Sequence, residues 1–315
     1  MPVQNAPVLT LTLNPTLDMS SDADHVVAED KIRCDAPTLD PGGGGINVAR
    51  AIGILGGQAT ALVALAGFRG QQVAALLTRE NVPHVVVEIP GETRLSLAVG
   101  DRAARTQYRF VMPGPLWGAD ENAACLATIK SHLCAGQFVV LSGSMPPGIS
   151  DSFIQDCSAF TADAGAKLVL DTTGGDLLNG NARVSVLRLD KVESEAMAGH
   201  PLPSTQDAAD FAQGLIARGV AEMVILGRGK DGSVLATKDT AWHGSGPDVT
   251  VHSKVGAGDS FLGAFTLALA RGDTPKTALA HGVAAASAAV MSAATALCAK
   301  RDVDALLPRI TVTEI

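Results

Sequence analysis

Residues 254–261 read KVGAGDSF, and this stretch does most to decide how the chain is interpreted. The apolar, alanine-containing residues 262–271 follow it directly and predict a helix. Two glycines before a helix let main-chain amides turn inward at its N-terminus, where unpaired N–H groups and the helix dipole bind phosphate oxygens. Asp259 can act there as a base or only as an N-cap. Taken alone, the stretch leaves both alternatives open.

Three further segments place glycines or polar groups after strand-like runs. Residues 41–50 read PGGGGINVAR, and four glycines opening a helix indicate that a ligand approaches the main chain closely, since they cost backbone entropy. Residues 11–18 read LTLNPTLD and end in Asp18, while residues 141–148 read LSGSMPPG and offer hydroxyls and amides. Ligands of open α/β sheets gather at the carboxyl ends of strands, although a lone aspartate such as Asp18 is more often a turn or cap residue.

Apolar runs of strand length alternate with helix-like segments, which predicts a mainly parallel sheet with crossover helices. The expected strands are residues 8–13, 61–65, 138–141, 167–170, 184–189 and 223–226. The expected helices are residues 46–55, 71–80, 122–134, 151–164, 206–217, 260–271 and 276–299. Residues 1–315 therefore form one α/β domain in our interpretation.

Two segments, at about residues 23–40 and 93–112, break this rhythm. Each alternates like a half-exposed strand, so we expect a small β-sheet lid inserted into the first third of the domain. A projecting sheet with one apolar face needs a partner surface, which favours a homodimer through the lid.

Charge and composition exclude several classes of protein. The formal net charge is −8 and there is no basic run, so we expect neither nucleic acid nor an anionic membrane as a partner. The five cysteines are widely spaced without a C-x-x-C pair, which favours reduced, buried thiols in a cytoplasmic protein. We expect no signal peptide, and the uncharged residues 278–299 are too rich in alanine for a membrane span.

Together, the four motifs resemble the PfkB carbohydrate kinase family from near residue 8 to near residue 300. The resemblance implies a ribokinase-like three-layer sandwich that uses ATP and Mg²⁺. Residues 31–34, 107–114 and 296–298 are most similar to the bacterial minor 6-phosphofructokinases, so the implied reaction is phosphorylation of fructose 6-phosphate to fructose 1,6-bisphosphate. A 1-phosphofructokinase and a tagatose-6-phosphate kinase are the alternatives within the family. A catalytically weakened sensor of sugar phosphate or nucleotide is the alternative from another class.

The resemblance also implies a role for individual residues. Asp259 would take the proton from the accepting hydroxyl, while amides of Gly256, Ala257 and Gly258 stabilise charge on the transferred phosphoryl group. The implied substrate-binding residues are Asp18, Lys31, Arg33, Gly43, Gly44, Asn47, Arg94 and Ser144. Within that set, Arg94 and Ser144, with Lys31 or Arg33 on the lid, would hold the phosphate that the sugar already carries.

Two segments depart from the family pattern. Where the family carries Lys-Pro-Asn-x-x-Glu to organise magnesium and its waters, residues 189–195 read LDKVESE. Placing Glu195 at the Glu position puts Val192 at the Asn position, and a shift by one puts Glu193 there instead. Both carboxylates therefore remain candidates to bind Mg²⁺ through water.

The second departure is residues 226–232, LGRGKDG, where Gly227 replaces an expected hydroxyl and Arg228 becomes a candidate phosphate contact. This segment matches G-x-G-x-x-G, but residues 233–237 continue as a strand rather than a helix, so a dinucleotide site is not indicated. The implied ATP-binding residues are Lys191, Gly227, Arg228, Gly229, Gly232, Gly256 and Gly258.

Overall fold

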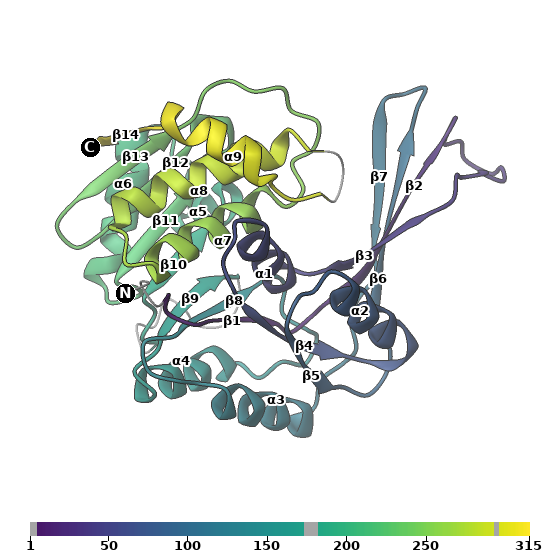
Figure 1. The fold of residues 1–315 in the computed structure, drawn as a ribbon, viewed down its shortest axis with the longest axis horizontal. Helices are drawn as coiled ribbons and strands as arrows, with labels where there is room; N and C mark the ends of the chain where they lie inside the picture. The colour runs from purple at the N-terminus through teal and green to yellow at the C-terminus, as the bar shows by residue number, and fades with distance from the viewer. Residues whose placement is uncertain (1–4, 173–181, 293–295) are drawn as a thin grey trace.

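The body of the molecule is a ten-stranded, mostly parallel sheet (Figure 1). This computed structural model describes residues 5–172, 182–292 and 296–315. The parallel strands are β1 (Val8–Thr12), β4 (Thr60–Leu65), β5 (His84–Glu88), β8 (Phe138–Ser142), β9 (Lys167–Asp171), β10 (Val186–Leu189) and β11 (Met223–Gly227). Antiparallel β12 (Ser233–Ala236), β13 (Ala241–Ser245) and β14 (Thr311–Glu314) extend one edge, giving the order β14-β13-β12-β11-β10-β9-β8-β1-β4-β5.

Helices cover both faces of this sheet, because successive side chains of its parallel strands point to opposite sides. On β8, Val139 and Leu141 belong to one hydrophobic cluster, whereas Phe138 and Val140 belong to another. The first cluster includes α3 (Ala119–Ser131), α4 (Phe153–Asp163) and α6 (Thr205–Ala217). The second includes α1 (Gly44–Ile54), α2 (Gly67–Arg79), α7 (Ala257–Ala270) and α8 (Pro275–Val290). The predicted three-layer sandwich is confirmed.

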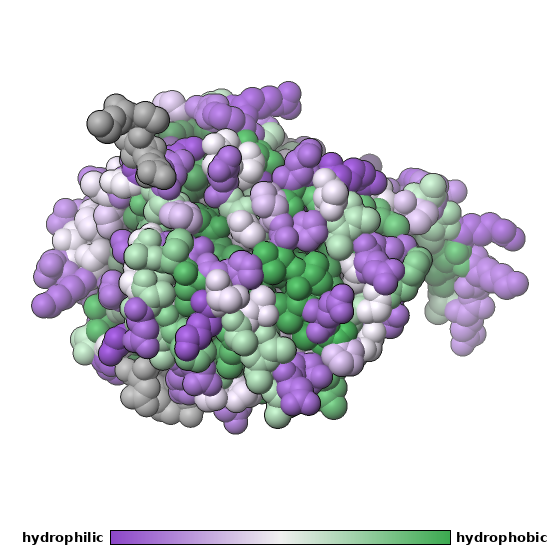
Figure 2. All heavy atoms as spheres, turned by 60° about the horizontal axis from the view of Figure 1, so that its bottom comes forward, coloured by the Kyte–Doolittle hydropathy of each residue, from purple (hydrophilic) through white to green (hydrophobic). Residues whose placement is uncertain are grey.

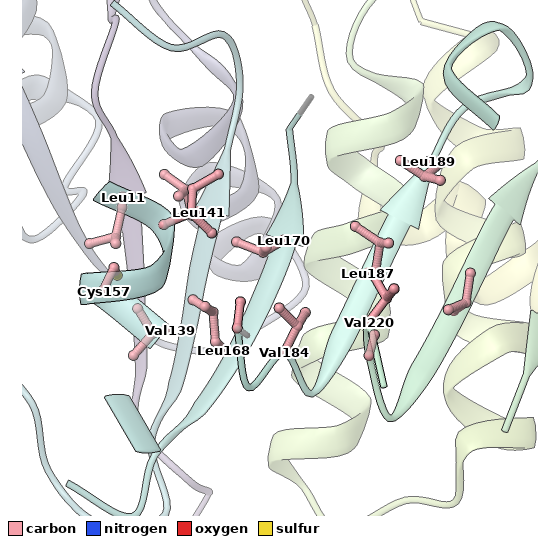
Figure 3. Close-up of a cluster of buried hydrophobic side chains, with 14 of the residues drawn as sticks. Leu11, Val139, Leu141, Cys157, Leu168, Leu170, Val184, Leu187, Leu189 and Val220 are labelled. Atoms are coloured by element: carbon pink, nitrogen blue, oxygen red, sulfur yellow. The ribbon is translucent and has the colours of Figure 1, made fainter. Parts of the chain in front are cut away.

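The first cluster shows how neighbouring strands build the core. In Figure 3, Leu11, Leu141, Leu170 and Leu187 come from four adjacent parallel strands and line one face beside Cys157 of α4. All five side chains are at most 1% exposed. Burial of a side chain of this size stabilises the fold by about 1.5–3 kcal/mol, so this layer holds the strand ends rigidly in place.

The order of strand connections creates a crevice next to β1, the third strand from the β5 edge of the sheet. Strand β1 pairs in parallel with β4 on one side and with β8 on the other, so the chain reverses its direction of winding there. The N-terminus of α1 enters this crevice: a Cβ on Gly44 would lie 2.3 Å from Ser142 Oγ, and one on Gly45 would lie 2.4 Å from the Leu11 carbonyl oxygen. Close approach to the chain's own strand ends therefore already requires these glycines, without a ligand.

The lid is a separate four-stranded sheet that projects from the body (Figures 1 and 2). It contains β2 (Thr16–Ala23), β3 (Thr38–Gly42), β6 (Arg94–Asp101) and β7 (Thr106–Val111), in the order β3-β2-β6-β7. The segment 94–111 lies within the predicted range. The first lid segment was predicted too late, because β2 begins at Thr16, where it pairs with Arg94 of β6, and residues 24–37 contain only the isolated bridge from Cys34 to Ala23.

The predicted helix over residues 276–299 is shorter in the structure. Helix α8 ends at Val290, whose carbonyl oxygen accepts hydrogen bonds from the amides of His252 and Ser253, and α9 (Lys300–Leu306) forms separately. Residues 293–295 of the predicted helix lie outside the described part of the chain. Among the described helices, none is long and apolar enough to cross a bilayer. The short elements α5 (Lys191–Ala198), η2 (Gly229–Asp231) and η3 (Leu307–Arg309) complete the fold.

The cysteines are only partly as predicted. All five lie in described segments and are free thiols. Burial raises the pKa of Cys125 and of Cys157 to about 12, which keeps these thiols protonated. Cys34 and Cys134 are exposed, contrary to the expectation that all five are buried, because both lie in loops outside the two helix layers.

Candidate active site

The centre of the candidate active site is the carboxylate of Asp259, the third residue of α7. Asn47, in the first turn of α1, donates a hydrogen bond from Nδ2 to Asp259 Oδ2 at 2.9 Å. The two helices pack closely, since a Cβ on Gly263 of α7 would lie 2.9 Å from the Cβ of Ala51 of α1. The structure therefore brings together the two glycine-rich segments, which lie far apart in the sequence.

The backbone before Asp259 forms a helix N-terminus that faces a cavity. Gly256 is the N-cap residue of α7 and has a left-handed φ of 74°, a conformation that favours glycine. The first amides of α7 have no carbonyl partner one turn earlier in the helix, so they are available to an anion. Because Gly256 occupies the N-cap position, Asp259 is not the cap of this helix.

Burial raises the pKa of Asp259 to about 6, and the negative charge of Asp171 adds to this effect. The hydrogen bond from Asn47 and the positive charge of Arg188 oppose it. A carboxyl group with this pKa is ionised at pH 7 and yet more basic than an ordinary aspartate. Such a group is suited to accept a proton from a bound hydroxyl.

A cavity of about 420 Å³ opens beside Asp259 at the carboxyl ends of the central strands. Its lining residues are Ser142, Gly143, Ser144, Asp171, Thr172, Arg188, Asp190, Glu193, Gly256, Gly258 and Asp259. The cavity is therefore bounded by the ends of β8, β9 and β10 and by the N-terminus of α7.

Arg188 and Asp171 were missed by the sequence analysis. Arg188 Nη1 donates to Asp171 Oδ1 at 2.5 Å, and Ser142 Oγ donates to Asp171 Oδ2 at 3.0 Å. A Cβ on Gly258 would lie 2.7 Å from Arg188 Nη2, so the guanidinium group lies against the helix N-terminus. The sequence contains a signal for each residue. Arg188 is a charged residue inside an otherwise apolar strand. Asp171 is the last residue of a parallel strand, the kind of strand-end position for which Asp18 was selected.

In residues 189–195 the structure pairs Asp190 with Glu193, an arrangement that neither placement of the family's Asn-x-x-Glu pattern considered above anticipated. Asp190 is the N-cap of α5: its Oδ1 accepts from the Glu193 amide at 2.8 Å, and Glu193 Oε2 accepts from the Asp190 amide at 2.8 Å. This reciprocal capping box places Asp190 and Glu193 three residues apart, which is the Asn-x-x-Glu spacing of the family pattern. Asp190 and Glu193 line the cavity, whereas Glu195 does not.

A second group of polar residues joins the lid to the body. Arg94, at the start of β6, donates from Nη2 to Ser144 Oγ at 3.3 Å and from Nε to the Asn14 carbonyl oxygen at 3.1 Å. Asn14 Nδ2 also donates to Ser144 Oγ at 3.1 Å. Burial raises the pKa of Asp18 on β2, although Arg109 and Arg94 oppose that shift. The predicted pair of Arg94 and Ser144 therefore lies together, with Asn14 as a member that sequence reasoning missed.

Gly42 and Gly43 connect the lid to this group. A Cβ on Gly42 would lie 2.2 Å from Asp18 Oδ2, and one on Gly43 would lie 2.5 Å from Thr12 Cγ2. Gly43 also has a φ of 123°, which L-residues rarely adopt. The glycine run thus allows β3 and α1 to pass between Asp18 and the end of β1.

Several predicted residues lie away from the cavity. Lys31 and Arg33 are exposed in the loop between β2 and β3, at the distal end of the lid, and neither lines the cavity. Lys191 is also outside it and pairs with Glu195 at 4.0 Å. Lys191 is the first residue of α5 and Glu195 is the fifth, and neither is among the residues that line the cavity.

Arg228 was predicted as a phosphate contact, but its side chain has another role. It is 8% exposed, and it donates from Nη1 to the Leu202 carbonyl oxygen at 2.9 Å and from Nη2 to the Pro203 carbonyl oxygen at 2.7 Å. These bonds hold the loop before α6. Gly229 and Gly232 have φ values of 63° and 84° and form the turn between antiparallel β11 and β12, so a strand follows this segment, as the sequence predicted.

Gly227 lies near the cavity wall at the end of β11. A Cβ on Gly227 would be 3.8 Å from Arg188 Nη2 and 3.8 Å from Asp190 Cα. These are ordinary van der Waals distances, so Gly227 lies directly beside two residues that line the cavity. The prediction that Gly227 contacts the nucleotide is compatible with this position.

The geometry of a strand-end cavity, an anion-binding helix N-terminus and a buried carboxylate defines a phosphoryl-transfer site on an α/β sandwich. The chain belongs to the PfkB family: residues 11–302 match the family described as pfkB family carbohydrate kinase. The protein is thus a carbohydrate kinase with a ribokinase-like fold.

Its relatives include phosphofructokinases. The chain is 38% identical over 297 residues to the ATP-dependent 6-phosphofructokinase isozyme 2 of Mycobacterium tuberculosis, covering 94% of this chain and 88% of that protein. It is 29% identical over 266 residues to the 1-phosphofructokinase of Xanthomonas campestris, covering 83% of each. The crystal structure of Escherichia coli phosphofructokinase-2 in complex with fructose-6-phosphate superposes with a TM-score of 0.89 at 34% identity, covering 96% of this chain and 98% of that chain.

Proposed function

We propose that this kinase transfers the γ-phosphoryl group of ATP to fructose 6-phosphate and forms fructose 1,6-bisphosphate. The observation that carries the proposal is the hydrogen bond from Asn47 to Asp259 beside the unpaired amides of α7. Arg94 and Ser144 support the choice of a substrate that already bears a phosphate, since they place a cation and a hydroxyl at the junction of lid and body. The relatives named as 6-phosphofructokinases support the choice of sugar.

In the proposed reaction Asp259 accepts the proton of the sugar hydroxyl as its oxygen forms a bond to the γ-phosphorus. The bond from that phosphorus to the bridging oxygen breaks, and ADP leaves with the electron pair. The amides of Ala257 and Gly258, with the guanidinium of Arg188, face the negative charge of the transferred group. Positioning and electrostatics thus supply most of the catalysis, as is usual for phosphoryl transfer.

The residues at the cavity fit a magnesium ion that ATP brings with it. Asp190, Glu193 and Asp171 present carboxylates to the cavity, and hard cations prefer such oxygens. Within the described segments, no group of three or more Asp, Glu, His or Cys side chains is close enough to hold a metal alone. Mg²⁺ would therefore keep waters and phosphate oxygens as ligands, and it would neutralise charge on the phosphates.

We also propose that two copies of the chain associate through their lids. On β7 every residue is exposed, and Phe110 and Val111 are 51% and 58% exposed. Exposed apolar residues on a sheet edge favour pairing with a second protein surface. Lys31 and Arg33 lie at the distal end of the same lid and do not line the cavity of their own chain. In the proposed dimer they would bind the phosphate of the sugar held by the second copy.

A panel of acceptors tests the proposed substrate. Initial rates of ADP formation with fructose 6-phosphate, fructose 1-phosphate, tagatose 6-phosphate and unphosphorylated fructose give a kcat/KM for each. We expect the highest value for fructose 6-phosphate. A higher value for either alternative phosphate would reassign the substrate, and no turnover with any acceptor would favour the sensor hypothesis, which the intact segment of Gly256 to Asp259 opposes.

A further inference from the structure

Behind the catalytic carboxylate, Asn47 contacts a second charged group. Arg50, one turn further along α1, directs Nη1 to Asn47 Oδ1 at 3.4 Å. The same Asn47 side chain donates from Nδ2 to Asp259 Oδ2 at 2.9 Å. Asn47 is therefore the middle member of a line of polar groups that ends at Asp259.

The chemistry of the two neighbours sets the orientation of the Asn47 amide. A guanidinium group has only N–H donors, and an ionised carboxylate has only acceptors. Arg50 therefore attracts the carbonyl oxygen of the amide, which leaves the NH₂ group facing Asp259. If the amide were rotated by half a turn, its oxygen would face the carboxylate, and its NH₂ would face the guanidinium. Both contacts would then be repulsive.

Arg50 is itself held in place by Glu80, the C-cap residue that follows α2. Arg50 Nε donates to Glu80 Oε2 at 2.6 Å, and Nη2 donates to Glu80 Oε1 at 3.2 Å. The side chains of Arg50 and Glu80 are only 14% and 25% exposed. A two-bond pair of this kind restricts the guanidinium plane more than a single contact does. The third nitrogen, Nη1, is then the one left to face Asn47.

We propose that Arg50 and Glu80 are positioning residues for phosphoryl transfer: through Nη1 of Arg50 they fix the amide of Asn47 so that its Nδ2 faces Asp259. The pair lies outside the cavity that contains Asp259, and instead lines a separate cavity of about 900 Å³ near the starts of β1 and β4. Neither side chain is thus placed to touch the reacting groups. This inference rests on the proposed function, in which Asp259 is the base.

A double-mutant cycle tests the proposal because it asks whether Arg50 acts through Asn47. The variants are Arg50→Gln, Asn47→Ala and the combination, with kcat/KM for fructose 6-phosphate and the melting temperature as readouts. We expect Arg50→Gln alone to lower kcat/KM by about tenfold. In the Asn47→Ala background the same change is expected to alter kcat/KM by less than about twofold, because the amide that Arg50 orients is gone.

A purely structural role for Arg50 predicts a different outcome. Its loss would then lower the melting temperature in both backgrounds and would reduce kcat/KM by the same factor in each, and that result overturns the proposal. Glu80→Gln provides a second variant that keeps Arg50: it is expected to give a smaller loss of kcat/KM that also disappears in the Asn47→Ala background. If Arg50→Gln does not fold, the Glu80→Gln cycle decides the question in the same way.

Arg69→Gln is the matched control, since it also removes an arginine–glutamate pair. Arg69 of α2 lies 3.7 Å from Glu92, and both side chains are more exposed, at 39% and 46%. We expect its kcat/KM to stay within about twofold of the unmodified protein. Asp259→Asn separates the two proposals. Normal turnover of this variant refutes Asp259 as the base. If its turnover is lost, and Arg50→Gln lowers kcat/KM by the same factor with and without Asn47, only the positioning role is refuted.

Discussion

Replacing Asp259 with asparagine is expected to stabilise the folded protein at neutral pH while it removes most of the turnover. Burial and the neighbouring Asp171 raise the pKa of Asp259 to about 6. Each factor of ten in an acid dissociation constant corresponds to about 1.4 kcal/mol, and an unperturbed aspartate has a pKa of about 3.9. Holding this carboxylate ionised at pH 7.5 therefore costs the folded state up to about 3 kcal/mol. An asparagine keeps an acceptor for Asn47 without the charge.

The sign of the pH dependence follows from the direction of the shift. Because the pKa of Asp259 is higher in the folded protein than in the unfolded chain, folding favours the protonated form. The destabilisation is absent below about pH 4, grows as pH rises, and is complete above about pH 6. At pH 5 it amounts to about 1.5 kcal/mol, or half of the value at pH 7.5.

Urea unfolding of both proteins at pH 5 and pH 7.5 measures this difference, because shared carboxylates titrate equally in each protein and cancel. We expect the Asp259→Asn variant to be more stable by up to about 3 kcal/mol at pH 7.5, and by half as much at pH 5. Asp239→Asn, in the exposed turn between β12 and β13, is the control and is expected to change stability by at most about 0.5 kcal/mol.

Turnover completes this test. Loss of a general base is expected to lower kcat by a factor on the order of 10² or more. A variant that is no more stable than the unmodified protein at pH 7.5 would refute the unfavourable burial of the carboxylate. A variant with unchanged kcat would show that Asp259 does not act as the base.

Three further predictions follow from the site geometry. The kcat/KM of the unmodified protein is expected to fall about tenfold for each pH unit below about 6, as Asp259 of the free enzyme is protonated, and a flat kcat/KM from pH 7.5 to pH 5 would contradict this. Arg94→Ala is expected to raise KM for the sugar phosphate by about tenfold or more with little change in KM for ATP, and the reverse pattern would remove Arg94 from the sugar side. Gly44→Ala brings a Cβ to 2.3 Å from Ser142 Oγ and is expected to destabilise the fold by about 1–3 kcal/mol. Gly53→Ala on the same helix is the control and is expected to be tolerated, because its Cβ would have nothing within 4 Å. Equal melting temperatures of the two variants would contradict the close approach of Gly44 to Ser142.

The parallel sheet was predictable because its strands are buried on both faces. Runs such as Phe138–Ser142 are mostly apolar and occur between helical segments, so the pattern predicted six of the seven parallel strands. Strand β5 at the sheet edge was missed, because His84–Glu88 is only partly buried. Strand β2 could not be predicted in the same way, because Thr16–Ala23 is partly exposed and contains Asp18, Ser20 and Ser21. Its structure depends on pairing with β6, which lies about 80 residues away and leaves no local signal.

The site shows the same division between local and long-range information. The motifs around Asn47 and Asp259 could be recognised locally, and their meeting follows from the position of strand ends in such sheets. The role of Arg228 could not be predicted, because its partners Leu202 and Pro203 lie 26 and 25 residues away in the sequence and their carbonyl oxygens leave no signal there. The register of Asp190 and Glu193 depends on a capping box that competing alignments of seven residues could not resolve.

The most direct measurement of the central claim is a crystal structure of the protein with fructose 6-phosphate and a non-hydrolysable ATP analogue. We predict that the accepting hydroxyl lies within hydrogen-bonding distance of an Asp259 carboxylate oxygen, with the terminal phosphate against the amides at the start of α7. The sugar's own phosphate is expected beside Arg94 and Ser144. A sugar bound with its free hydroxyls turned away from Asp259, or a terminal phosphate bound elsewhere, would contradict the account.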